Sequence, residues 1–144
     1  MLKLSDLSIR LASTNDLHFI KDSWTKTIKH IYPNQYVLDF SNKFNAKLDA
    51  AIPQSVILVA ALDTDQNNIV SYLVYTIFHE AIIILFAYTL LDERRQGFIN
   101  HLLSVANPNN NRVVLTSPTK NENILKHLHE KYIFDPSILQ LVFP

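Results

Sequence analysis

Two arginines and one glycine form the most chemically suggestive group in this chain. The run Arg94-Arg95-Gln96-Gly97 follows an apolar segment typical of a buried strand and precedes apolar residues with helical spacing. The first amides of a helix have no partner inside it and carry partial positive charge, so a phosphate could bind there beside the cations. Gly97 is the only glycine among 144 residues and has no side chain to hold a ligand away. Alternatively, Gly97 only permits an unusual backbone angle and the arginines are solvated.

Other well-known sites are absent from the sequence. No Gly-Lys-Ser follows Gly97 and no further glycine accompanies it, which excludes a Walker A loop and a dinucleotide fingerprint. The chain has no cysteine, so disulfides, thiolate zinc sites and cysteine nucleophiles are excluded. It also has no Gly-x-Ser-x-Gly motif. His127 and His129 stand two apart on a predicted helix and face different sides, so we expect no metal site.

Composition indicates a single domain, 1–144, with a packed core. The chain is 48% hydrophobic and 18% charged, which argues against disorder. Lys+Arg and Asp+Glu are 13 each, and this zero net charge argues against a general nucleic-acid binder. The N-terminus lacks a signal-peptide pattern. The most apolar stretch, 81–91, is shorter than the roughly 20 residues of a membrane-spanning helix. We therefore expect a cytoplasmic protein without membrane association.

Hydrophobic periodicity predicts alternating groups of strands and helices. Strands are expected at 7–12, 55–62, 69–78, 79–89 and 112–116, with another in the tail 132–144, and helices at 17–31, 35–51, 98–106 and 122–131. A polar turn at 63–68 and a tight reversal near His79-Glu80 make the middle strands antiparallel neighbours. The fold class is α/β (α+β), with a mixed, mostly antiparallel central sheet flanked by about four helices.

This order, together with Arg94-Arg95-Gln96-Gly97-Phe98-Ile99, resembles the GNAT N-acetyltransferase superfamily. The acyl-CoA signature of that superfamily reads Arg/Gln-x-x-Gly-x-Gly/Ala, on the loop between the fourth strand and the following helix. Arg94, Gly97 and Ile99 stand at its three defined places. The likeness extends over nearly the whole chain. The opening Ile9-Arg10-Leu11-Ala12 is similar to the usual GNAT opening, and Asp22-Ser23-Trp24, Ser117-Pro118-Thr119 and Tyr132-Ile133-Phe134-Asp135-Pro136 resemble a phage-encoded GNAT-like subgroup.

The resemblance implies that acetyl-CoA, the cosubstrate, lies between the fourth and fifth strands. Loop amides would hold its pyrophosphate, and the backbone edge of the fourth strand would pair with its pantetheine. An amine of a small molecule or a protein would attack the thioester directly in a ternary complex. The implied binding residues are Ala87, Tyr88 and Thr89 on the strand and Arg94, Arg95, Gln96, Gly97, Phe98 and Ile99 in and after the loop.

The acid and the base are less well defined by the resemblance. GNAT bases often lie on the fourth strand, which makes Glu80 the candidate base and its neighbour His79 an alternative. His129 falls near the place where many GNAT enzymes carry a tyrosine acid, and an imidazolium could donate the proton. Both are equally compatible with ordinary surface positions. Ile99 replaces a small residue, so its side chain either crowds the ligand or turns into the core.

Two functions from different classes fit this reading. The first is an acyl-CoA-dependent N-acetyltransferase. The second is a catalytically inactive GNAT-fold protein that binds a host protein partner. Trp24, Tyr32 and Tyr36 either line an acceptor pocket or seal helix against sheet, and Tyr88 is either a cleft hydroxyl or a core aromatic. The apolar tail 138–143 either forms a homodimer or completes the sheet.

Overall fold

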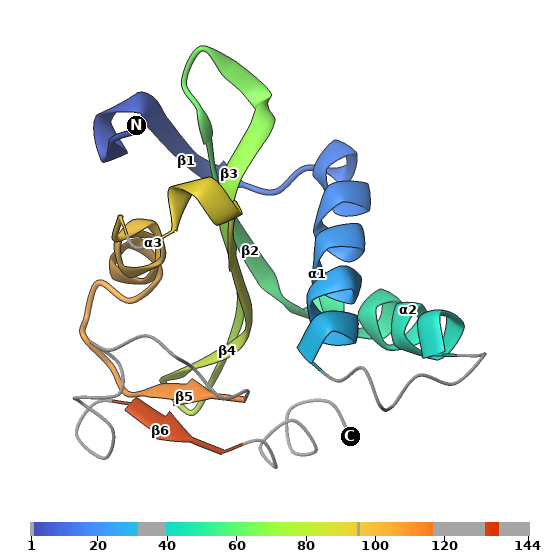
Figure 1. Cartoon of the computed structure of the whole chain (residues 1–144). Helices are drawn as coiled ribbons and strands as arrows, with labels where there is room; N and C mark the ends of the chain where they lie inside the picture. Colours follow the sequence, from blue (N-terminus) through green and yellow to red (C-terminus); the bar gives the residue numbers. More distant parts are fainter. Residues whose placement is uncertain (1, 32–39, 95, 117–131, 136–144) are drawn as a thin grey trace.

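A six-stranded sheet organises the chain, as the computed structural model shows (Figure 1). The structure describes residues 2–31, 40–94, 96–116 and 132–135. The strands follow one another across the sheet in chain order. They are β1 (Leu7–Leu11), β2 (Val56–Leu62), β3 (Asp65–Phe78), β4 (Ala81–Thr89), β5 (Val113–Leu115) and β6 (Tyr132–Phe134).

The type of strand pairing changes once across this sheet, from antiparallel to parallel. β1 to β4 are antiparallel neighbours, whereas β5 is parallel to β4 and β6 is parallel to β5. Parallel neighbours need a long crossover connection, and the segment containing α3 (Phe98–Ala106) supplies one between β4 and β5. The expected mixed, mostly antiparallel sheet is thus confirmed.

The hairpin between β2 and β3 is longer than the sequence predicted. Only Asp63 and Thr64 form the turn, and β3 begins at Asp65 rather than Ile69. Residues 65–68 are polar and exposed, yet they extend the strand. Polar composition suggested a loop here, but this part of the hairpin projects beyond the core, where both faces of a strand can be polar.

Helices cover the two faces of the sheet separately. α1 (Leu17–Ile31) and α2 (Phe40–Ala51) lie on one face, and α3 lies on the other (Figure 1). Because successive strand residues point to opposite faces, Ile83 packs in the cluster beneath α1 while Ile82 and Ile84 pack beneath α3. The first cluster includes Ile20, Trp24, Leu48, Val59, Tyr72 and Val74, and the second includes Leu73, Leu102, Leu103 and Val113.

A buried ion pair fixes the start of α1 to the sheet. Arg10 on β1 donates from Nη1 to Asp16 Oδ2 (2.6 Å) and from Nη2 to the backbone carbonyl of Gln66 (2.8 Å). Asp16 also accepts from the backbone amide of Ser13 (2.7 Å). These hydrogen bonds, above all those from Arg10, lower the pKa of the Asp16 carboxyl. One charged group therefore links β1, the β2–β3 hairpin and the first turn before α1.

Several sequence expectations lie outside the described residues. These are the helix at 122–131 with His127 and His129, the tail 138–143, the first residues of the helix expected at 35–51, and the side chains of Tyr32, Tyr36 and Arg95. Within the described ranges, no helix is both long and apolar enough to cross a membrane. The strand expected in the tail is present as β6.

Candidate functional site

Within the described residues, β5 pairs with only the first half of β4. The two strands pair only from Ile82 to Ile84. Beyond that point the register of β4 against β3 shifts, because Val74 faces Phe86 while Tyr75 faces Ile84. This shift makes the intervening residue of β4 a β-bulge, and bulges bend a strand and increase its twist. The bulge therefore bends β4 just beyond the residues that pair with β5.

The bulged residue is Leu85, and its effect is visible in the packing. Leu85 and the next residue, Phe86, both contact the core cluster beneath α1, although consecutive strand residues normally alternate. The last paired carbonyl, that of Ile84, also accepts a hydrogen bond from the Thr116 hydroxyl just beyond β5 (2.8 Å). Among the residues that the structure describes, the last backbone pair between β4 and β5 is thus Ile84 with Leu115.

The second half of β4, residues 86–89, presents a free backbone edge, with which no described strand pairs on the β5 side. Tyr88 O accepts from the Ser71 hydroxyl of β3 (2.7 Å), and the amide of Leu90 also bonds to a β3 carbonyl (2.9 Å). Backbone groups of successive strand residues point to opposite sides, so those of Ala87 and Thr89 point away from β3. No described residue pairs with Ala87 on this side. The edge expected at 87–89 is present, but the backbone groups of Tyr88 face β3.

A short 3-10 helix, η5 (Leu91–Glu93), connects β4 to residues 94–97, which we call the arginine loop. Arg94 folds back and donates from Nε to Thr89 O (3.0 Å), which occupies one carbonyl of the free edge. Gln96 Nε2 donates to Glu93 Oε2 (2.8 Å). The side chains of Arg94 and Gln96 therefore attach the loop to β4 and to η5. The backbone amide and carbonyl of Ala87 and the amide of Thr89 remain available on the free edge.

Gly97 begins α3 in a left-handed conformation, with φ 80° and ψ 14°. A Cβ at this position would meet no atom within 4 Å, so the backbone angle and not the lack of space requires glycine. The first helical hydrogen bond runs from His101 N to Gly97 O (3.0 Å), and no side chain caps the helix. The amides of the first turn therefore face the open loop without an intrahelical partner.

Ile99 does not cover this loop. It is half-buried and packs against the cluster that contains Leu102 and Leu103, beneath α3. Phe98, the first residue of the helix, is also buried there. The sequence left open whether the Ile99 side chain crowds the ligand or turns into the core, and in the structure it turns into the core.

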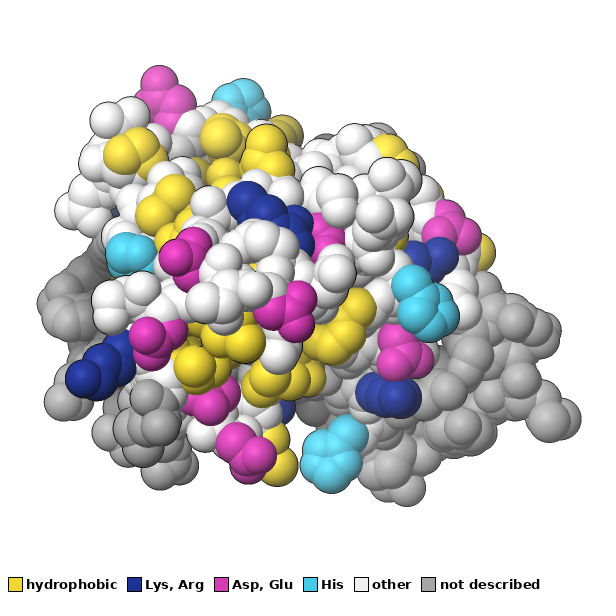
Figure 2. Space-filling model, turned by 90° about the horizontal axis from the view of Figure 1, so that it is seen from above, with side chains coloured by type: hydrophobic (Ala, Val, Ile, Leu, Met, Phe, Trp, Pro, Cys, Tyr) yellow, Lys and Arg dark blue, Asp and Glu magenta, His cyan; other side chains and the backbone are white. Residues whose placement is uncertain are grey.

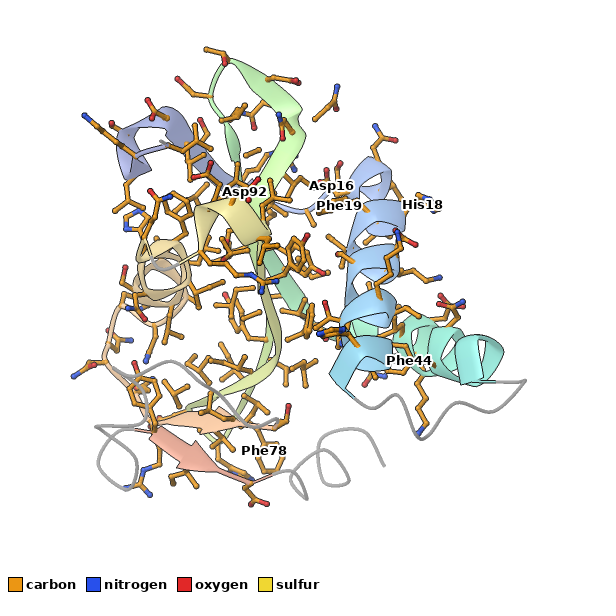
Figure 3. The ribbon with its side chains drawn as sticks, viewed as in Figure 1. Asp16, His18, Phe19, Phe44, Phe78 and Asp92 are labelled. Carbon is orange, nitrogen blue, oxygen red and sulfur yellow. The ribbon has the colours of Figure 1, made fainter. Side chains whose placement is uncertain are left out.

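Glu80 and His79 lie far from the loop. They form the tip of the β3–β4 hairpin, both are exposed, and both have positive φ (68° and 48°). Figure 3 shows Phe78, next to this tip, and Asp92, on η5, at opposite ends of the sheet. The nine residues of β4 separate them, which corresponds to roughly 30 Å of strand. The structure therefore does not bring Glu80 to the free edge or to the arginine loop, and His129 lies outside the described residues.

An aromatic cluster backs the open half of β4. Tyr88 stacks on Tyr72 (centroids 5.2 Å apart), and Phe86 stacks on Trp24 (5.0 Å, 5° between planes). Phe86 and Tyr88 are half-buried. Tyr72 is fully buried, its hydroxyl contacts Ser23 Oγ (2.7 Å), and burial raises the pKa of Tyr72. Tyr88 and Trp24 thus belong to the core, with Tyr88 exposed in part.

The end of the molecule that carries the loop is mixed in charge. Figure 2 looks onto this end and shows Asp and Glu side chains distributed among hydrophobic ones. Exposed carboxylates include Asp63 in the β2–β3 turn and Asp92 on η5, and the guanidinium of Arg94 is exposed just after η5. A cationic ligand and an anionic one would both meet opposite charges here.

No protein-family model matches this chain, and no curated protein matches it in sequence. Solved structures do match it. A ribosomal-protein-alanine N-acetyltransferase from Brucella melitensis biovar Abortus 2308 has a TM-score of 0.59 at 17% identity, covering 88% of this chain and 91% of that one. The PaiA N-acetyltransferase of Thermoplasma acidophilum, in complex with coenzyme A, has a TM-score of 0.52 at 16% identity over 71% and 70% of the chains. A GNAT family acetyltransferase from Brucella melitensis, in complex with acetyl-CoA, also has a TM-score of 0.52 at 16% identity, over 83% and 80%. The chain therefore has the fold of GNAT acetyltransferases.

Proposed function

We propose that this protein is an acyl-CoA-dependent N-acetyltransferase with acetyl-CoA as its cosubstrate. One observation carries the proposal: beyond a bulge, β4 has a backbone edge that no described strand pairs with, and this strand is followed by a loop with uncapped helix amides. Two of the solved structures with this fold contain acetyl-CoA or coenzyme A, which supports the same ligand here.

The residues of the edge and loop fit the two polar parts of such a ligand. The pyrophosphate would accept hydrogen bonds from the amides of Gln96, Gly97 and Phe98, near the positive end of the α3 dipole. The pantetheine amides would pair with the free groups of Ala87 and the amide of Thr89. The positive charge of Arg94 would attract the phosphates, while its Nε stays hydrogen-bonded to Thr89 O.

The transfer step follows from this placement. An amine nitrogen attacks the thioester carbonyl carbon, a C–N bond forms and the C–S bond breaks. The nitrogen loses one proton to a base or to water as the amide forms, and the departing thiolate takes up a proton. The thioester would lie beyond Ala87, near the bulge at Leu85, beside the half-buried rings of Phe86 and Tyr88. The acceptor is an amine of a small molecule or of a protein. His129 remains our proposed acid, whereas Glu80 could act only through a long chain of water molecules.

A second candidate is a catalytically inactive GNAT-fold protein, of phage-like type, that binds a host protein partner. The observation that favours it is the position of Glu80 and His79 at the far tip of the β3–β4 hairpin. The charged side chain that hydrogen-bonds to the free edge of β4 is that of Arg94, at Thr89 O. A protein of this kind has the GNAT fold but does not transfer an acetyl group.

Calorimetric titration with acetyl-CoA tests the proposal. We expect micromolar binding to the wild-type chain. Ala87→Pro should weaken it by about tenfold or more, because it removes a donor from the free edge. The Ala87 amide points away from β3, so this change removes no β3–β4 hydrogen bond. Ala87→Gly keeps the donor and is the matched control.

Three outcomes separate the alternatives. Binding that Ala87→Pro weakens and Ala87→Gly retains supports the proposed site. Equal binding by a folded Ala87→Pro variant would mean that the ligand lies elsewhere. No binding to wild type at millimolar acetyl-CoA would overturn the acetyltransferase proposal and leave the partner-binding candidate, which capture of interacting proteins would then examine.

A further inference from the structure

A hollow lies beside the arginine loop on the side of the N-terminal segment. Its walls are Leu2, Lys3, Leu4 and Ser5 from the start of the chain, and Gln96 and Phe98 from the loop and the first residue of α3. Figure 1 shows the N-terminal segment next to α3 and η5. Segments more than ninety residues apart in the sequence therefore form one open, mostly apolar surface next to the uncapped helix end.

Backbone hydrogen bonds hold Lys3 at the rim of this hollow. Its amide donates to Asp6 Oδ2 (2.8 Å), and its carbonyl accepts from the Asp6 amide (2.9 Å). The Asp6 carbonyl in turn accepts from the Asp63 amide at the β2–β3 turn (2.9 Å). The segment that carries Lys3 is thus attached to the β2–β3 turn through Asp6.

The side chain of Lys3 is exposed and available to a ligand. Among the described residues, no carboxylate forms an ion pair with its ammonium group. Two carboxylates of these segments have other partners, since Asp6 accepts from the Lys3 amide and Glu93 accepts from Gln96. A free cation therefore stands over an apolar floor that includes buried Phe98 and exposed Leu4.

From this arrangement we infer that the hollow takes the 3′-phosphoadenosine part of coenzyme A, with Lys3 contacting the 3′-phosphate. The inference rests on the proposed function, which puts the pyrophosphate at the amides of Gln96 to Phe98. Gln96 and Phe98 line both places, so a nucleotide that continues from the pyrophosphate enters the hollow directly. The apolar floor suits a purine ring, and the lysine supplies the opposite charge for the phosphate.

Comparison of coenzyme A with 3′-dephospho-coenzyme A tests this role of Lys3. Calorimetric titrations use the full chain without an N-terminal tag, in wild-type form and as Lys3→Gln. We expect wild type to prefer coenzyme A by about fivefold, which is about 1 kcal/mol when a tenfold change is ~1.4 kcal/mol. Lys3→Gln should abolish the preference and leave the affinity for the dephospho ligand unchanged. Added salt should reduce the wild-type preference.

Lys47→Gln is the matched control, because Lys47 is exposed on α2, on the opposite face of the sheet. It removes the same charge and should keep the full preference. Equal wild-type affinities for the two ligands, or a preference that survives Lys3→Gln, would overturn the inference while leaving the proposed function standing. Failure of wild type to bind either ligand would overturn both.

Discussion

Replacement of Gly97 by alanine and by asparagine separates backbone strain from steric crowding. Gly97 has φ 80°, and a Cβ there would meet no atom within 4 Å. The cost of alanine must therefore come from the left-handed conformation, which is about 1–2 kcal/mol for an ordinary residue. Loss of glycine also reduces the entropy of the unfolded chain, which offsets about 0.4–1 kcal/mol. We expect Gly97→Ala to lower the free energy of unfolding by about 1 kcal/mol.

Asparagine gives the contrast that makes the experiment decisive. Asn is larger than Ala but tolerates the left-handed region better. Gly97→Asn should therefore cost less than Gly97→Ala, whereas a steric origin would give the opposite order. Urea unfolding measures both, with the fluorescence of Trp24 as the signal, because it is the only tryptophan and is 7% exposed.

Two results would refute this reasoning. If asparagine costs more than alanine, space and not φ requires the glycine. If alanine costs nothing, residue 97 does not hold the left-handed conformation in solution. The same variants also bear on the proposed ligand site, because a backbone that relaxes away from φ 80° at residue 97 would redirect the loop amides and weaken acetyl-CoA binding.

Three further predictions concern the core and pH dependence. Leu102→Ala should cost about 3 kcal/mol in urea unfolding because Leu102 is fully buried, whereas Val105→Ala, at a 46% exposed site, should cost less than about 0.5 kcal/mol. Asp16→Asn should cost about 1–3 kcal/mol at pH 7, because it removes the negative charge beside Arg10 and replaces one of the two accepting oxygens with an NH2 group. Because Arg10 lowers the pKa of Asp16, this contribution is present above the ordinary value of 3.8 and is lost as pH falls through the lowered pKa, so wild type and variant should converge in acid. Tyr72→Phe should cost about 1–2 kcal/mol at pH 7. Burial raises the pKa of Tyr72, so wild type should lose stability as pH rises above its ordinary value of 10.0, and the variant should show a smaller loss.

The main elements of the fold could be predicted from periodicity alone. Leu17 to Ile31 has helical spacing and forms α1, and the last expected helix before β5 forms over 98–106 as predicted. The tight reversal at His79-Glu80 is also confirmed, as the two-residue turn between β3 and β4. These segments were predictable because an apolar face with one period can be buried in only one kind of element.

The extension of β3 was not predictable from the same pattern. Residues 65–68 are polar and exposed, and of these four only Asp65 has a register partner on β2, Leu62, before a register shift that ends at Ile69 opposite Ala61. Their conformation depends on the partner strand, and polar composition carries no information about a partner. The hydrogen bond from Arg94 to Thr89 was missed for a similar reason, because a side chain that folds back on the preceding strand leaves no periodic signal.

By itself the sequence determined the order of elements, the likeness to the GNAT fold and the place of the single glycine, Gly97, just before a helix. The tertiary structure decided where β4 leaves β5, because the bulge at Leu85 lies within an uninterrupted apolar run and no alternation marks it. It also decided that Ile99 turns inward and that Glu80 lies at the far end of the sheet. These outcomes depend on strand register and helix packing, which join residues distant in the chain and are set only when the whole core assembles.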